Sequence, residues 1–297
     1  MDPGSNFADR SAALDRLWDY SQPAASEARF RAMLATERDP EYRAEVFTQV
    51  ARAQGLQQKF TEALQTLDEV DHSLTPAMTL ARARSLLERG RVFNSSGRPD
   101  EAVRFFEQAL HVASDNNHPY YAVDAAHMLG IACEPNAALA WSKRALDMAE
   151  AATEPRARGW RGTLYNNLGW TYHESGDFEQ ALSMFEASLA IEQKDGQTRL
   201  IGIARWSIAK TLRHLDRLDE ALAIQTELLD HPDRQNNTSE GYTREELGEC
   251  LLALDRANEA ASHFARAWSL LHADDWLRSQ QADRLDRLKR LGKVEAD

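Results

Sequence analysis

The segment Gly162–Gly196, GTLYNNLGWTYHESGDFEQALSMFEASLAIEQKDG, has two apolar stripes separated by a turn. The first stripe is spaced 3, 1 and 3 residues apart, as on one helix face: Tyr165, Leu168, Gly169 and Tyr172. The second stripe is Ala181, Phe185 and Ser188. Between them, Ser175–Gly176–Asp177 combines a helix stop with a helix start. The segment therefore predicts a helical hairpin.

A small residue recurs along the chain at the place that Gly169 holds in this hairpin. Its successive separations are 39, 40, 39, 40 and 39 residues, at Ala51, Gly90, Gly130, Gly169, Ala209 and Gly248. A hairpin cannot bury its apolar face alone, and stacking on the next copy buries it. The chain is therefore expected to be an all-α array of stacked hairpins, without strands.

A second series of small residues follows the first: Ala63, Ala102, Ala138, Ala181, Ala221 and Ala260. The offset is 12 residues in five units and 8 in the unit of Gly130, so the loop near Glu134–Pro135–Asn136 is expected to be one helical turn shorter. Large residues follow four positions later: Leu67, Phe106, Phe185 and Phe264. They should fill the space beside the small residues. Ser142 and Gln225 break the trend, and Trp141 could compensate for Ser142.

This pattern resembles the tetratricopeptide repeat family over roughly residues 9 to 274. The resemblance implies a right-handed superhelical solenoid whose first helices line a concave groove. The 39–40-residue period is longer than the usual 34 and is similar to the repeats of kinesin light chains, Leu-Gly-Asn-rich polarity adaptors and bacterial peptide-sensing regulators. Departures include Arg205 and Arg244 in place of a large residue, and Gln54 and Cys133 in place of tyrosine. HEAT repeats share the period but lack the Gly…Ala…Phe spacing.

We expect seven helix pairs between an N-terminal segment 1–8, disordered or a tag remnant, and a C-terminal helix and tail, 275–297. The pairs are expected near 9–42, 44–77, 83–116, 123–152, 162–195, 202–235 and 241–274. Leu285 and Leu288 belong to one apolar stripe of the last segment, which fits a capping helix that shields the end of the core. The alternative is an amphipathic helix that binds a partner.

Composition argues against several classes of function. The net charge of −12 disfavours nucleic acid as a partner. The sequence has no run of 18 apolar residues for a membrane span and no apolar N-terminal signal, so a cytoplasmic location is expected. Cys133 and Cys250, far apart, are expected to be reduced thiols. HExxH, GxGxxG, GxxxxGK[ST] and GxSxG motifs are absent, so we expect no enzyme, no cofactor and no metal site.

Function is therefore expected to reside in a groove that binds a protein or peptide. Helical geometry places twelve candidate residues away from the core stripe of the first helices: Arg52, Arg84, Arg91, His127, Asn166, Asn167, Trp170, His173, Trp206, Lys210, Arg213 and Tyr242. The alternative function is a peptide- or ligand-sensing regulator that acts by capturing a partner. Homo-oligomerisation is open.

Three features of these candidates have competing interpretations. Trp170 and Trp206 near Lys210 suit an interaction hot spot, but each could instead pack against a neighbouring helix. Asn167 holds the place where, by the resemblance, an asparagine pins a peptide backbone; it could also be a plain surface residue. The arginines suit an acidic ligand or pair with nearby carboxylates. The family's chaperone-type carboxylate clamp is not expected, because residues flanking Asn167 in the adjacent units do not match it.

Overall fold

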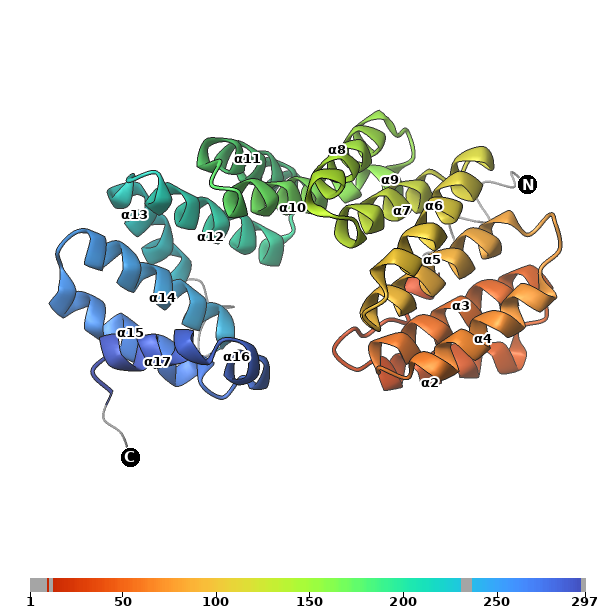
Figure 1. Cartoon of the computed structure of the whole chain (residues 1–297), viewed down its shortest axis with the longest axis horizontal. Helices are drawn as coiled ribbons and strands as arrows, with labels where there is room; N and C mark the ends of the chain where they lie inside the picture. Colours follow the sequence, from red (N-terminus) through yellow and green to blue (C-terminus); the bar gives the residue numbers. More distant parts are fainter. Residues whose placement is uncertain (1–9, 11–12, 231–236, 295–297) are drawn as a thin grey trace. The chain divides into compact units, whose positions relative to one another are not determined.

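The computed structural model describes Arg10 and residues 13–230 and 237–294, and these contain helices and no strand. The chain divides into two compact units, Met1–Trp160 and Arg161–Asp297. The predicted segment 1–8, the end of the unit predicted at 202–235 and the last residues of the tail lie outside the described residues. Within each unit, consecutive helices pack against each other in pairs (Figure 1).

The first unit begins with α2, Pro23–Thr36, after a short N-terminal segment. Three helix pairs follow: α3 (Pro40–Leu56) with α4 (Phe60–Ser73), α5 (Thr79–Ser95) with α6 (Pro99–Asp115), and α7 (Pro119–Ala132) with α8 (Pro135–Ala151). The short α9, Pro155–Arg158, comes next. Proline occupies the first turn of several of these helices, where its missing N–H costs no hydrogen bond.

The second unit also contains three helix pairs. They are α10 (Trp160–Glu174) with α11 (Phe178–Asp195), α12 (Thr198–His214) with α13 (Leu218–Leu229), and α14 (Thr238–Ala253) with α15 (Ala257–Leu271). Each pair begins two to four residues before the repeat window expected from the sequence. Two short helices, α16 (Asp275–Gln280) and α17 (Ala282–Leu291), follow the last pair.

The recurring small residue allows the two helices of a pair to touch. A Cβ added at Gly169 would lie 2.5 Å from Cε1 of Phe185, and one at Gly248 would lie 2.7 Å from Cζ of Phe264. Both phenylalanines are fully buried. The predicted fit of small against large residues is therefore observed. At Gly130 the facing group is the Ser142 hydroxyl, in the pair whose first helix is shorter.

The turn inside a pair uses one backbone conformation repeatedly. The residue seven positions after the small residue has a positive φ in five pairs: Gln58 (60°), Gly97 (78°), Gly176 (83°), Asp216 (59°) and Asp255 (57°). Glycine adopts this conformation without steric strain, aspartate tolerates it, and glutamine is more strained there. The glycine expected to stop the helix at position 176 is thus one of several residues at an invariant turn.

The C-terminal segment covers the end of the second unit's core. Leu277, Leu285 and Leu288 are buried against Phe264 and Leu271 of α15. This arrangement fits the expected cap, except that it is two helices rather than one, with a break at Gln281. Trp276, next to the buried Leu277 on α16, is 58% exposed.

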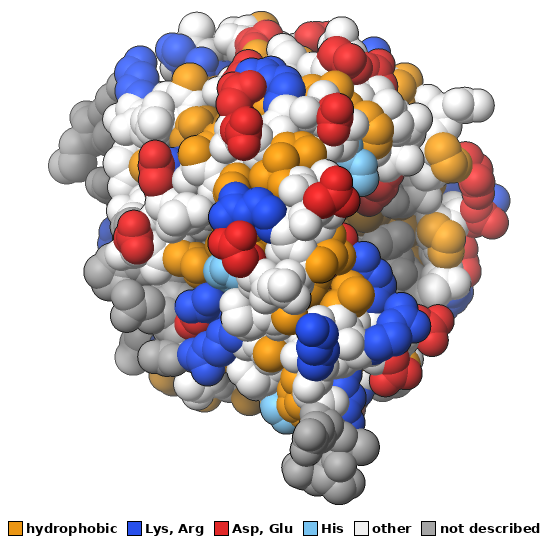
Figure 2. Space-filling model, turned by 90° about the vertical axis from the view of Figure 1, so that its left-hand side faces the viewer, with side chains coloured by type: hydrophobic (Ala, Val, Ile, Leu, Met, Phe, Trp, Pro, Cys, Tyr) orange, Lys and Arg blue, Asp and Glu red, His pale blue; other side chains and the backbone are white. Residues whose placement is uncertain are grey.

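The face shown in Figure 2 mixes acidic and basic side chains with small apolar areas, which is typical of a solvated surface. Of the helices in the described ranges, none combines the length and the apolar character needed to cross a bilayer.

Candidate functional site

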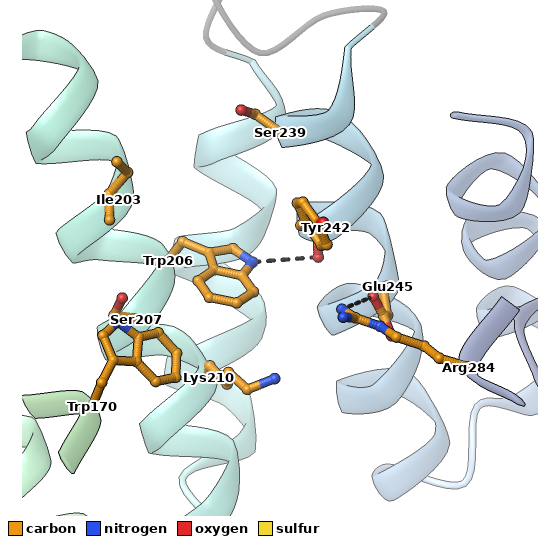
Figure 3. A pocket seen from close by; sticks show the side chains of 9 residues that line it. All are labelled: Trp170, Ile203, Trp206, Ser207, Lys210, Ser239, Tyr242, Glu245 and Arg284. Carbon is orange, nitrogen blue, oxygen red and sulfur yellow. Dashed lines mark hydrogen bonds and ion pairs between the residues drawn. The ribbon is translucent and has the colours of Figure 1, made fainter. Parts of the chain in front are cut away.

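The second unit contains a pocket of about 530 Å³, and α10, α12, α14 and α17 supply its lining (Figure 3). Nine residues line it: Trp170, Ile203, Trp206, Ser207, Lys210, Ser239, Tyr242, Glu245 and Arg284. Four of them, Trp170, Trp206, Lys210 and Tyr242, are among the candidates expected from the sequence. Pockets of this size with apolar walls and a few polar groups are the usual form of a ligand site.

Three aromatic rings form one wall of the pocket. Trp170 and Trp206 have ring centroids 5.8 Å apart, and Trp206 and Tyr242 have centroids 6.3 Å apart. The three residues are separated by 36 positions, one helical turn less than the repeat period, so the row runs diagonally across three successive first helices. Trp206 Nε1 donates to the Tyr242 carbonyl oxygen at 3.3 Å, which fixes its indole (Figure 3).

Trp170 contacts the core and also lines the pocket. Its ring packs edge-on against Phe185 of the core at 5.2 Å. The Gly169–Phe185 contact therefore positions a pocket residue, because a displaced phenylalanine ring would displace the indole.

Cations and carboxylates form a series of ion pairs along the same wall. Glu246 is 2% exposed and accepts from Lys210 Nζ at 2.6 Å and from Arg213 Nε at 2.9 Å. Glu245 is held by Arg284 through two bonds of 2.8 and 2.5 Å. Glu249 pairs with Arg287. Burial alone would raise the pKa of Glu246, but Lys210 and Arg213 together lower it, so the carboxylate stays ionised.

Several buried polar atoms at or beside the pocket lack a hydrogen-bond partner within the described chain. Ser207 belongs to the pocket lining and is 0% exposed, and its Oγ is one of these atoms. Asn166 Oδ1 is another such atom. Asn166 lies one helical turn before Trp170 on α10, and its amide donates to Asn167 Oδ1 at 3.4 Å. Unsatisfied buried groups carry a free-energy cost that a bound ligand can relieve.

His173 and His214 pack together beyond the aromatic row, with ring centroids 4.8 Å apart. Burial lowers the pKa of His173 to about 4, with His214 and Lys210 adding to the effect. Burial also lowers the pKa of His214. Both rings are therefore neutral near pH 7, and they act as packing groups at that pH.

In the first unit the expected arginines are paired with carboxylates. Arg84 is 4% exposed and bonds to Glu45 at 3.3 Å and to the Tyr121 hydroxyl at 2.7 Å. Arg91 grips Asp124 with bonds of 2.5 and 2.7 Å. This arrangement follows the second of the two interpretations of the arginines, since their charges are neutralised within the protein.

Two other candidates of the first unit also have partners within that unit. Arg52 pairs with Glu88 at 3.2 Å and lies over the Trp18 and Tyr20 rings. His127 packs on Trp160 at 5.2 Å, and burial lowers its pKa. The structure thus divides the twelve candidates between the two units, and only those of the second unit surround the aromatic pocket.

Models of the tetratricopeptide repeat match residues 85–120 and 121–194. These residues include α6, α7, α8 and α10 and most of α5 and α11, whose hairpins carry the small-to-large contacts described above. Residues 85–194 of the chain are therefore assigned to tetratricopeptide repeats. A comparison with curated proteins found no match.

Solved structures share the fold of these tetratricopeptide repeats at low identity. The apo form of RapI is 12% identical with a TM-score of 0.74, over 98% of this chain and 82% of that one. The quorum sensor NprR from B. thuringiensis, in its apo form, is 15% identical with a TM-score of 0.64, over 99% of this chain and 82% of that one. NprR in complex with its cognate peptide NprX is 14% identical with a TM-score of 0.59, over 100% of this chain and 86% of that one.

A third protein is much longer than this chain. It is a signal transduction ATPase with numerous domains from Pyrococcus horikoshii, which has a tetratricopeptide repeat sensor. It is 13% identical with a TM-score of 0.70, over 90% of this chain but only 41% of that one.

Five of the pocket residues are not among the candidates expected from the sequence: Ile203, Ser207, Ser239, Glu245 and Arg284. Arg284 is the one that lies furthest along the chain. It lies on α17, which the sequence assigns to the cap. Its separation of 39 residues from Glu245 equals the repeat period, so α17 contributes to the wall as the first helix of another repeat would. Extending the repeat register past residue 274 would have found it.

Proposed function

We propose that this protein is an interaction module that binds a peptide segment along the wall formed by α10, α12 and α14. The observation that carries the proposal is the aromatic pocket with unsatisfied polar atoms at its edge. Trp170, Trp206 and Tyr242 offer stacking surface for an apolar side chain. Asn166 and Asn167, one turn away on α10, offer an acceptor and a donor to the peptide backbone.

The known proteins add support at the level of the fold. NprR has been solved with its cognate peptide, so a related array holds a peptide. A second candidate function is a ligand-sensing regulator that acts through partner capture, and the sensor described for the Pyrococcus ATPase favours it. Hydrogen exchange measured with and without a bound peptide separates the two. A scaffold is protected only at the wall, whereas a sensor also changes protection in distant helices.

The proposal is tested by selecting peptides against the full chain. A random heptapeptide library, displayed between Gly-Ser linkers, supplies the ligands, and fluorescence anisotropy gives their dissociation constants. The double variant Trp170→Phe, Trp206→Leu should weaken binding by about tenfold or more, since aromatic anchors dominate such interfaces. Trp276→Leu, at an exposed tryptophan outside the pocket, is the matched control.

The outcome against the proposal is equally defined. Either no peptide is enriched over beads without protein, or the enriched peptides bind the double variant as well as they bind the wild type. A melting temperature measured for each variant keeps loss of binding separate from loss of fold.

A further inference from the structure

The pocket wall carries one positive charge more than the carboxylates beside it. Lys210 and Arg213 share the single carboxylate of Glu246, whose two oxygens each accept from one of them. The neighbouring pairs, Arg284 with Glu245 and Arg287 with Glu249, are balanced. Four cations therefore face three carboxylates, a local charge of +1 in a chain whose net charge is −12.

The aromatic faces are already in contact with the protein's own cations. Lys210 Nζ lies 5.2 Å from the Trp206 ring centroid, and the Arg284 guanidinium lies 5.2 Å from that of Tyr242. A ligand lysine or arginine would have to displace one of them and would meet the other at close range. The wall is thus unsuited to a cationic side chain, although aromatic rings often attract one.

The polar atoms available to a ligand are mainly hydrogen-bond donors. Lys210 Nζ has three N–H groups, and the Glu246 contact takes one. Both oxygens of the lining carboxylate Glu245 are taken by Arg284.

We propose that the peptide bound at this pocket presents an acidic side chain next to an apolar one, with the carboxylate at Lys210 and the apolar group between Trp170, Trp206 and Tyr242. The inference rests on the proposed function. Charge complementarity selects the occupant: a surplus of one charge matches one carboxylate, and a doubly charged phosphate would exceed it. An acidic side chain, rather than a chain terminus, supplies the carboxylate.

The heptapeptide selection tests this directly, because linkers on both sides keep terminal carboxylates away from the pocket. Enriched peptides should carry Asp or Glu beside an apolar residue. Changing that acid to its amide should weaken binding to the wild type about three- to tenfold, and raising the salt concentration should shrink the difference.

Two lysine variants locate the effect. Lys210→Met keeps the methylene packing over Trp206 but removes the charge, so acid and amide peptides should bind it equally within about twofold. Lys289→Met is the matched control, because Lys289 lies over Trp268 at 5.4 Å outside the pocket, and it should retain the acid preference. Should Lys210→Met fail to fold, Lys210→Gln removes the same charge, and Lys210→Arg should keep the preference.

Contrary results separate the two proposals. Enriched peptides that depend on Trp170 and Trp206 but carry no acid, or an acid effect that persists in Lys210→Met, overturn the inference and leave the proposed function standing. Enrichment of basic residues overturns it as well. A selection that yields no peptide, or peptides indifferent to the tryptophans, overturns both.

Discussion

The contact between Gly169 and Phe185 makes a sharp test of how the hairpins are held together. In Gly169→Ala, the new methyl group would lie 2.5, 2.6 and 2.9 Å from three carbons of the Phe185 ring. Ordinary carbon contacts are about 3.5–4.0 Å, so the overlap is about 1 Å. The ring is fully buried and packs on Trp170, and it cannot move without disturbing the pocket.

Two opposing terms set the size of the effect. Overpacking a close-packed core costs about 1–3 kcal/mol. Alanine is a better helix former than glycine by about 0.8–1.0 kcal/mol. The net destabilisation is therefore about 1–2 kcal/mol, taking the upper part of the range because the obstacle is a rigid ring.

Gly130→Ala is the matched control in the repeat that lacks the phenylalanine. Its new methyl group would meet the Ser142 hydroxyl at 2.5 Å, which can rotate away, and then the Ser142 backbone nitrogen at 3.3 Å. The helix-propensity gain should then offset the contact, so the change is neutral or slightly stabilising.

Urea unfolding followed by circular dichroism measures both variants, and hydrogen exchange over α10 and α11 localises the loss. Because repeat arrays can unfold in parts, the two variants are compared in the same experiment rather than against an absolute free energy. Equal stabilities for Gly169→Ala and Gly130→Ala would refute the small-against-large account. Phe185→Leu added to Gly169→Ala should recover part of the loss by making room for the methyl group.

Three further predictions follow from single contacts. Gln58→Gly should raise the free energy of unfolding by about 0.5–1 kcal/mol because it removes left-handed strain at the turn. Gly97→Ala should lower it by a similar amount, since φ at Gly97 is 78° and the new methyl group has open space. The midpoints of urea unfolding measure both changes. Glu45→Gln should lower the free energy of unfolding by at least about 2 kcal/mol, because Glu45 is 1% exposed and its loss leaves the buried Arg84 charge without its carboxylate partner. Thermal melting measures this change, and an unchanged melting temperature would contradict it. The unfolded chain binds a proton at His173 between pH 6.5 and about 4, and the folded chain does not, so the free energy of unfolding should fall as the pH drops through that window, and His173→Phe should flatten the decline.

The sequence predicts the hairpins well because their packing is local and steric. Gly169 and Phe185 lie 16 residues apart in one hairpin, and a fixed spacing of small and large residues is enough to place both on facing surfaces. The turn at Gly176 is predicted for the same reason. Its equivalents Gln58, Asp216 and Asp255 are hard to recognise in the sequence, because residues other than glycine also adopt the positive φ of this turn.

The candidate site is harder to predict because many of its contacts join different repeats at offsets unlike the repeat period. Arg91 meets Asp124 over 33 residues, and Lys210 meets Glu246 over 36. Alignment at 39–40 residues places such partners in different columns. The row Trp170, Trp206 and Tyr242 has the same 36-residue offset, and only its first two members are grouped from the sequence.

Burial is also beyond the sequence pattern. Arg84 and Lys210 both project from the expected inner face of a first helix, yet Arg84 is 4% exposed and Lys210 lines a pocket. The difference depends on what the neighbouring helices bring to each position. Tyr121 and Glu45 enclose the arginine, whereas the lysine is next to the pocket-lining Trp206.

The binding of a peptide at the aromatic pocket is tested most directly by fluorine NMR of protein labelled with 5-fluorotryptophan. The chain has seven tryptophans, and single Trp-to-Phe variants assign their signals. Titration with a selected heptapeptide should shift the signals of Trp170 and Trp206 and leave that of the exposed Trp276 in place. Shifts confined to tryptophans outside the pocket, with Trp170 and Trp206 unmoved, would contradict the account.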